Sequence, residues 1–277
     1  AFKLSLRYLD LFQLIFYACL TSTVVLLIAV VVQGHWHGLR STLHHHWRLS
    51  LVSALLNPFA YYLILFAAYD RLPAQVAQPI NYTWAIVLTL LSIVVLKQKV
   101  TLRDLLAAGI CYIGVVIIVA QGDWRVFNLA NPAGIALALL STFVWATYWI
   151  LNIRDPREPT IALCANFIVA LPVTLVLCLA LSDPFDVPIE GLFGAVWVGM
   201  FEMGLAFLAW SEALRLAENT SRVSNLIFLS PFLSLILIHQ VLGEPIYATT
   251  FVGLGVIVAG LLLQRSANEH PEAGDSN

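Results

Sequence analysis

Charged residues are scarce in this chain. Asp, Glu, Lys and Arg make up 11% of its 277 residues, whereas hydrophobic residues make up 60%. A soluble domain has about 25% charged residues. This scarcity excludes an ordinary soluble domain and indicates a polytopic membrane protein, in which lipid replaces water around most side chains. The net charge of −2 points to no class of partner.

Paired cysteines are also missing. Cys19, Cys111, Cys164 and Cys178 lie far apart in apolar runs, and no CxxC pair occurs. This excludes a disulfide framework and a structural zinc site. We interpret the cysteines as small apolar packing residues, and the sequence predicts no bound metal and no cofactor.

Histidine is concentrated in one polar segment, residues 35–48, which includes the run His44, His45 and His46. A histidine cluster can bind zinc. However, this segment has no carboxylate or cysteine to complete a site. We therefore predict a solvated basic loop.

Long apolar runs dominate the remainder of the chain. A membrane-spanning helix needs roughly 17–25 mostly apolar residues. Nine runs qualify: 11–32, 49–69, 74–96, 102–120, 132–151, 161–181, 189–214, 221–242 and 246–263. The connections are short, so consecutive spans run antiparallel. We predict an all-α polytopic membrane protein, with a disordered polar tail at 266–277.

The distribution of positive charge predicts the orientation. Of the 14 Lys and Arg residues, four lie on the side of the visible N-terminus and ten on the other side. Cytoplasmic loops are enriched in Lys and Arg. We therefore predict that the C-terminus is cytoplasmic and the visible N-terminus external.

An internal repeat relates the two halves of the chain. A shift of 144 residues places Asn81 on Asn225 and Gly109 on Gly253, within a matching layout of polar break, apolar run, charged hairpin and glycine-bearing span. The second half then has five spans and the visible first half four. Because the chain begins without methionine, we expect a further helix before Ala1.

This arrangement predicts two domains, 1–121 and 132–265, each a five-helix repeat with the first helix of the first repeat absent from the sequence. Since five is an odd number, the two repeats have opposite orientations in the membrane. Such inverted repeats are typical of secondary transporters.

A polar, aromatic stretch interrupts the run at 74–96. It contains Gln78, Asn81, Tyr82 and Trp84, and Pro79 removes one backbone donor from the helix. Polar groups in a span usually face the bundle interior or a wet cavity. Positions 78, 81 and 84 share one helix face. The stretch is either part of a substrate site or a set of contacts between helices.

The repeat supplies a counterpart to this stretch. Shifted by 144, positions 78, 81 and 84 fall on Arg222, Asn225 and Phe228. Both halves thus present a donor, an amide and a ring at equivalent places, as a site at the repeat interface would. Arg222 either pairs with a substrate carboxylate or extends to the membrane surface.

Two other spans carry polar or aromatic faces. Asn57 and Tyr61 are four residues apart and share a face, which either lines a cavity or joins helices. Trp145 and Tyr148 share a face with Ser141, and Trp145 is either a cavity wall or part of the core.

Two further features have competing readings. Glu202 lies deep in its span and is expected to be buried. It either couples transport to protons, accepts a substrate ammonium, or bonds across helices. Trp149 and Asn152, near the cytoplasmic end of their span, are typical of an interfacial aromatic belt.

Small residues mark two spans as scaffold. The run at 102–120 and its repeat counterpart permit close helix packing. Their small residues are Ala107, Ala108, Gly109, Gly114, Gly253, Gly255 and Gly260.

These motifs resemble the drug/metabolite transporter (DMT) superfamily, EamA type. The second half has the family pattern: S-P at 230–231, L-G-E-P at 242–245, then a glycine-bearing span. The first half departs from it, with L-K-Q-K at 96–99. Within the superfamily, I-N-Y-T-W at 80–84, F-V-W-A-T-Y at 143–148 and G-L-A-F-L-A-W at 204–210 resemble the aromatic amino-acid exporter branch, YddG type.

The resemblance implies an exporter in the bacterial inner membrane, which alternates between inward- and outward-open states around a central cavity. We therefore predict a secondary exporter of aromatic or other neutral amino acids, or of similar small amphipathic metabolites. The predicted substrate-binding residues are Asn57, Tyr61, Gln78, Asn81, Tyr82, Trp84, Trp145, Tyr148, Glu202, Asn225 and Phe228.

Other functions are weaker readings of the same residues. The alternatives are an exporter of another metabolite or drug, an intramembrane enzyme, a receptor and a channel. An enzyme would need paired aspartates, zinc spacing or a Ser/His pair at depth, and a selective ion channel would need a ring of charges. We predict no enzyme activity and no nucleic-acid partner; the predicted partners are a small-molecule substrate and the lipid bilayer.

Overall fold

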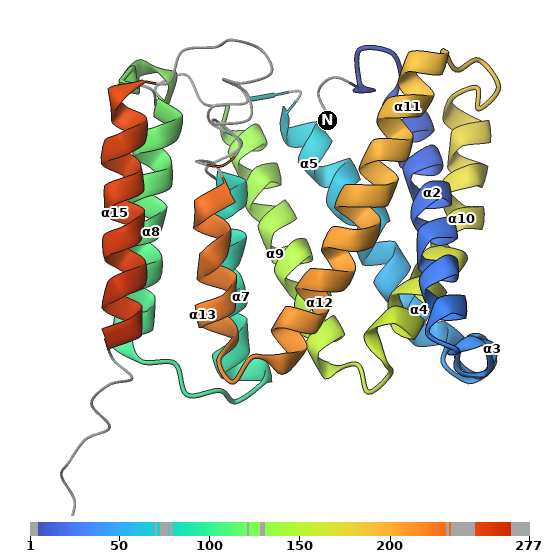
Figure 1. Cartoon of the computed structure of the whole chain (residues 1–277). Helices are drawn as coiled ribbons and strands as arrows, with labels where there is room; N and C mark the ends of the chain where they lie inside the picture. The colour runs from blue at the N-terminus through green and yellow to red at the C-terminus, as the bar shows by residue number, and fades with distance from the viewer. Residues whose placement is uncertain are drawn as a thin grey trace, which may run out of the picture. The chain divides into compact units, whose positions relative to one another are not determined.

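The computed structural model describes residues 5–69, 71, 72, 77, 80–120, 122–127, 131–230, 233 and 247–266, and every regular element within them is helical (Figure 1). The helices are α2 (Leu11–Val32), α3 (Trp36–His45), α4 (Trp47–Ala54), η1 (Leu55–Ala60), α5 (Tyr61–Tyr69), α7 (Trp84–Val95), α8 (Leu102–Ala120), η2 (Trp124–Phe127), α9 (Pro132–Arg154), α10 (Pro159–Leu181), α11 (Ile189–Trp197), η3 (Val198–Leu205), α12 (Ala206–Leu216), α13 (Thr220–Asn225), η4 (Leu226–Leu229) and α15 (Ala248–Ser266).

The predicted class, an all-α polytopic membrane protein, is confirmed. Among the described residues, five helices are long and apolar enough to cross a bilayer: Leu11–Val32, Trp47–Tyr69, Pro132–Arg154, Pro159–Leu181 and Ile189–Leu216. Two shorter apolar helices are Ile80–Val95 and Ala248–Leu263. Much of the predicted span at 221–242 lies outside the described residues.

The prediction of a loop at 35–48 is wrong, because this segment contains helix α3. Its polar composition suggested solvent, but Leu39 and Thr42 lie three residues apart and are both buried. One apolar stripe is enough to hold a short helix against the protein while the other faces stay polar. Gly34, at φ +72°, forms the turn that separates α2 from α3.

Contacts divide the chain into two compact units that do not follow the predicted halves. Unit 1 comprises Ala1–Tyr62 and Leu151–Leu216, and unit 2 comprises Leu63–Ile150 and Ala217–Asn277. Each half of the sequence therefore contributes helices to both units. The chain passes from one unit to the other within α5 and near the end of α9.

In unit 1, α2 packs against α10, η3 and α11, and α4 packs against α10. Asp10 caps the N-terminus of α2 in a capping box. The Asp10 carboxylate accepts a hydrogen bond from the Gln13 backbone nitrogen at 3.0 Å, and the Gln13 side-chain oxygen accepts one from the Asp10 backbone nitrogen at 3.0 Å. The same Gln13 amide donates to the carbonyls of Asp183 at 2.7 Å and Asp186 at 3.0 Å. The cap thus also holds the acidic loop between α10 and α11.

A buried ion pair ties the start of α10 to α4. The Arg157 guanidinium bonds to both carboxylate oxygens of Asp155, at 2.5–3.0 Å. It also donates to Ser50 Oγ at 2.7 Å and to Asn166 Oδ1 at 3.2 Å. The two charged side chains are only 4% and 5% exposed. The short Arg154–Pro159 connection is therefore held by charge-assisted bonds as well as by apolar packing.

In unit 2, α8 packs along α15, and the two helices lie side by side in Figure 1. A Cβ built on Gly114 would lie 2.6 Å from Ile257 Cγ1 and 2.7 Å from the Gly253 carbonyl oxygen. A Cβ on Gly260 would lie 2.7 Å from Cys111 Sγ. Glycine is needed at these positions so that the two backbones can approach.

Gly109 and Gly255 do not share this role, since a Cβ at either position would meet no atom within 4 Å. The predicted scaffold role thus applies to Gly114, Gly253 and Gly260 and not to every glycine of the two helices.

Gly114→Ala is expected to destabilise the protein by about 1–3 kcal/mol, since the added methyl would overpack the α8–α15 contact. Gly109→Ala, on the same helix, is the matched control and should leave stability unchanged or slightly higher, because alanine favours a helix. Thermal unfolding in detergent, followed by tryptophan fluorescence, measures both variants. Equal unfolding midpoints would contradict the proposed close packing.

The turn between α7 and α8 has a lysine where the family pattern has a glycine. Lys97 has φ +55°, in the left-handed region that favours glycine. The Gln98 nitrogen then bonds back to the Ser92 carbonyl at 3.2 Å, which ends α7. The replacement of Gly by Lys changes the residue but keeps the turn.

The helices of unit 1 depart from regular α-helical geometry at two places, a kink at Asn57 inside η1 and a π-helical segment, η3. η1 covers Leu55–Ala60 and η3 covers Val198–Leu205. A shift of 144 carries 55–60 onto 199–204, inside η3. The kink and the π-helical segment therefore lie at positions that the predicted offset relates. π-Helical turns often mark functional positions in a helix.

Candidate functional site

Four aromatic rings from α7 and α9 form a cluster in unit 2. Trp145 stacks on Tyr148, with centroids 5.7 Å apart and an interplanar angle of 25°. It meets Trp84 edge-on at 6.4 Å and Trp149 edge-on at 5.5 Å. Tyr148 and Trp149 are 5.1 Å apart. These are the offset and edge-to-face geometries that aromatic rings prefer.

The polar members of these two faces also meet. Asn81 Nδ2 donates to Ser141 Oγ at 3.3 Å, one turn along each helix from the Trp84–Trp145 contact. The predicted face on 81 and 84 and the predicted face on 141, 145 and 148 are therefore in direct contact. Their spacing of three or four residues let the sequence place the members of each face on one side of its own helix, and the structure brings the two faces together. Their role in substrate binding stays a prediction.

Burial separates the rings of the cluster into two layers. Trp145 is 9% exposed and Trp84 5%, whereas Tyr148 and Trp149 are 0% and 2% exposed. All four rings are therefore buried, and Trp145 is the most exposed of them. The interpretation of Trp149 as part of an interfacial belt is wrong, because its ring is enclosed by this cluster.

Trp149 is also the member of the cluster that sequence reasoning missed. Its position four residues after Trp145 was a usable signal, since residues four apart lie on one face. Its place near the end of a span suggested a belt instead.

Helix α13 brings Asn225 and Phe228 to the same unit. Thr89 Oγ1 on α7 bonds to Ser221 Oγ on α13 at 3.2 Å, and Gln98 Oε1 accepts from the Thr220 nitrogen at 3.2 Å. Asn225 is 0% exposed, and Phe228, which follows in η4, is also 0% exposed. Asn225 lies in α13, which packs against α7, and Asn81 lies just before α7, in the apolar helix Ile80–Val95.

The Asn225 side chain has an unusual environment. Among the described residues, neither its amide nitrogen nor its amide oxygen has a hydrogen-bond partner. An unsatisfied buried polar group costs about 1–3 kcal/mol. A buried asparagine whose side chain makes no hydrogen bond to the described residues is a candidate for binding a ligand.

Unit 1 holds the other predicted residues. Asn57 is 1% exposed and leaves the helical conformation at φ −146°, ψ 124°, inside η1, and its side-chain atoms also have no partner among the described residues. Tyr61 begins α5 and contacts Tyr62, with centroids 5.0 Å apart. Asn57 therefore resembles Asn225 in being a buried amide with unused hydrogen-bonding capacity.

Glu202, the acidic residue predicted to lie deep in its span, falls within η3. Its side chain is exposed on η3, beside the exposed Phe201. The position of a residue along a span does not determine which way its side chain faces. The π-helical turns of η3 also change which residues share a face of this helix. Two other residues were predicted to bind substrate. The Tyr82 side chain is half-buried, and Gln78 lies outside the described residues.

The predicted histidine run lies on α3 and in the residue that follows it. His44 and His45 are exposed, with ring centroids 4.7 Å apart. Within the part of the chain that the structure describes, no three His, Cys, Asp or Glu residues are grouped so as to hold a metal ion.

Comparison with known proteins places this geometry in a family. A model of the EamA-like transporter family matches residues 1–120 and 132–265. A solved crystal structure, 17% identical, superposes with a TM-score of 0.81 and covers 96% of this chain and 91% of its own, which shows a shared fold.

Three relatives illustrate the range of similar sequences. Protein PecM of Dickeya dadantii is 26% identical over 228 residues, which cover 78% of this chain and 73% of that protein. The uncharacterised transporter YvbV of Bacillus subtilis is 25% identical over 257 residues, with coverages of 90% and 81%. The aromatic amino acid exporter YddG of Ancylobacter novellus is 25% identical over 215 residues, with coverages of 75% and 74%.

Proposed function

The chain belongs to the EamA-like transporter family, and on that premise we propose that it exports aromatic or other neutral amino acids across the inner membrane by alternating access. Membership makes it a multi-pass membrane transporter. The substrate, the direction, the membrane and the cytoplasmic C-terminus are parts of the proposal.

The aromatic cluster of unit 2 is the observation that carries the substrate class. An amino-acid side chain needs an apolar, preferably aromatic wall, and its charged ends need a few polar groups. Trp145 and Trp84 offer ring faces and edges, and Asn81 lies one turn away from Trp84. A relative named as an aromatic amino acid exporter supports the same class.

Asn225 suits the charged end of such a substrate. An amide offers two donors to a carboxylate and one acceptor to an ammonium group. The buried amide of Asn225 uses none of these within the described residues. Its repeat counterpart, Asn81, lies on the helix that packs against α13. Together the two amides support a site for a zwitterion beside the aromatic wall.

The inverted repeat supports the mechanism. Halves of opposite orientation can exchange conformations, and this exchange opens a site to one side of the membrane and then to the other. The kinked segment η1 and the π-helical segment η3 lie at positions that the proposed repeat relates. Interrupted helices bend more readily than continuous ones, so these segments are suitable hinges. The predicted division into repeats at 1–121 and 132–265 belongs to this proposal.

Transport in proteoliposomes tests the proposal. We expect labelled Phe and Trp to enter faster than in protein-free liposomes, and faster than Thr or Met. Asn225→Leu should lower uptake about tenfold or more, because a hydrogen bond to a charged group contributes about 1.5–3 kcal/mol. The same variant should unfold at an equal or higher temperature, since it removes an unsatisfied buried amide.

Leu226→Ala, an exposed position beside Asn225, is the control and should transport normally. If none of the four amino acids moves while another class of metabolite does, the amino-acid assignment is wrong and the exporter of another metabolite is the better reading. If Asn225→Leu transports like the wild type, the proposed polar site is misplaced.

A further inference from the structure

Helix α3 lies at a membrane surface. It begins four residues after α2 ends at Val32, and α4 starts two residues after α3 ends at His45. Both flanking segments, Leu11–Val32 and Trp47–Tyr69, are long and apolar enough to cross a bilayer. A ten-residue polar helix between two consecutive spans must lie where both spans leave the membrane.

One face of α3 is anchored to unit 1. Leu39 and Thr42 are 2% and 6% exposed, and α3 packs against the start of α10. A Cβ built on Gly38 would lie 2.6 Å from Ile161 Cδ1 of α10. This close contact determines which face of α3 is turned outward.

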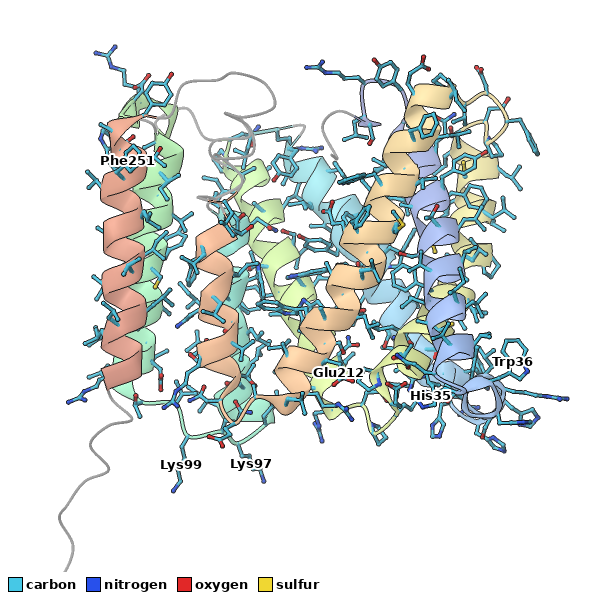
Figure 2. All side chains as sticks on the ribbon, in the orientation of Figure 1. His35, Trp36, Lys97, Lys99, Glu212 and Phe251 are labelled. Carbon is cyan, nitrogen blue, oxygen red and sulfur yellow. The ribbon has the colours of Figure 1, made fainter. Side chains whose placement is uncertain are left out.

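The outward face is basic and aromatic. His37, Arg40 and His44 are exposed and lie three and four residues apart, on one side of the helix. Trp36, the first residue of α3, is 53% exposed, and Trp47, the first residue of α4, is 47% exposed. Figure 2 shows the Trp36 side chain at the end of α2, pointing away from the ribbon. A shallow hollow on this face is lined by His37, Arg40, Ser41, Leu43, His44 and His45.

Nearby carboxylates do not neutralise this face. No Asp or Glu occurs from Leu11 to Tyr69. Glu158 lies 3.4 Å from His35 and also caps α10 through the Ile161 nitrogen. Asp155 is paired with Arg157. Among the described residues, no carboxylate forms an ion pair with Arg40 or Arg48, and Arg48 stacks over the Trp47 ring at 5.6 Å.

We infer that the outward face of α3 is a docking surface for anionic phospholipid headgroups. Arginine, imidazole and hydroxyl groups in the hollow match the charge and acceptor oxygens of a lipid phosphate. Exposed tryptophans at both ends match the headgroup region, where this residue concentrates. Basic amphipathic helices lie in this plane, and each basic residue attracts anionic lipid. This inference goes beyond the proposed transport function and does not depend on it.

Lipid titration of the whole protein tests this inference. Phosphatidylglycerol or phosphatidylcholine is added to detergent-solubilised protein, and bound lipid is counted by native mass spectrometry. We expect the wild-type protein to retain more phosphatidylglycerol than phosphatidylcholine. Arg40→Gln with Arg48→Gln should weaken that binding about 25-fold, or about fivefold for each charge removed, since one basic residue contributes about 1 kcal/mol.

Lys99→Gln with Arg103→Gln is the matched control. It removes two exposed positive charges from the connection into α8, far along the chain from α3, and Figure 2 shows Lys99 pointing into the surroundings. It should keep the wild-type affinity. Equal losses in the two variants, or equal retention of both lipids by the wild type, would overturn the inference.

Inorganic phosphate serves as a second probe, because the same groups could bind a free anion. Phosphate should not displace the lipid, since the exposed tryptophans add contacts that only a lipid offers. If phosphate at equal concentration displaces phosphatidylglycerol fully, α3 is an anion site and not a lipid surface. Trp36→Ala should then have no effect on retention, whereas the inference expects a clear loss.

Discussion

Replacing Trp145 with leucine is expected to reduce the preference of the transporter for aromatic substrates. Trp145 makes ring contacts with Trp84, Tyr148 and Trp149 and is the most exposed ring of the four. A contact between two rings contributes about 0.5–1.5 kcal/mol beyond its apolar area. Loss of one such contact with the substrate should lower the ratio of Phe to Leu uptake about 2- to 12-fold.

Trp145→Leu suits this test better than Trp145→Ala. Truncation of a buried Trp to Ala costs about 3–5 kcal/mol of stability, and loss of folded protein would lower uptake of every substrate. Leucine keeps much of the apolar volume. Trp145→Phe should keep most of the selectivity, since it retains a ring at the same place.

The measurement is uptake of labelled Phe and Leu in proteoliposomes, per amount of monodisperse protein. Trp197→Leu is the matched control, because Trp197 is 57% exposed on α11 of unit 1 and belongs to another aromatic contact, with Phe201 at 4.5 Å. It should keep the wild-type ratio. An unchanged ratio in Trp145→Leu would assign the cluster to core packing alone.

Arg157→Ala is expected to cause a large loss of stability, about 3–5 kcal/mol. The variant would leave the Asp155 carboxylate, which is 5% exposed, without its charge partner. It would also leave Ser50 and Asn166 without the guanidinium that they contact. Uncompensated charge in a buried place is far more costly than the pair itself.

Thermal unfolding in detergent measures this effect. Asp155→Ala with Arg157→Ala should be less destabilising than the sum of the two single changes, because the double variant buries no lone charge. Arg215→Ala is the control: Arg215 pairs with Glu212 at 3.0 Å, but these side chains are 47% and 33% exposed. Such surface pairs contribute about 0–1 kcal/mol. Similar losses for Arg157→Ala and Arg215→Ala would contradict the role assigned to the buried pair.

The ends of two helices could be predicted from the sequence. Lipid offers no hydrogen bonds, so a span must be a continuous apolar helix and must end where polar residues begin. The predicted runs at 11–32 and 102–120 agree with α2 and α8 at both ends. Periodicity likewise placed Asn81 with Trp84, and Trp145 with Tyr148, on shared faces, because side chains three and four residues apart must lie on one side of a helix.

Other features were decided only by the tertiary structure. Arg157 reads as one more cytoplasmic charge until Asp155, Ser50 and Asn166 surround it. Gly114 and Gly109 are alike in sequence, and only the approach of α15 separates them.

The position of a residue along its helix likewise does not determine its burial. Trp149 sits near the end of its helix and is buried, whereas Glu202 sits in the middle of its helix and is exposed. The sequence by itself determined the membrane class and the faces of individual helices, because these follow from the solvent and from the period of the helix. Which face meets which neighbour, and hence which charges, rings and glycines are enclosed, depends on contacts between residues distant in the chain, and only the folded structure supplies them.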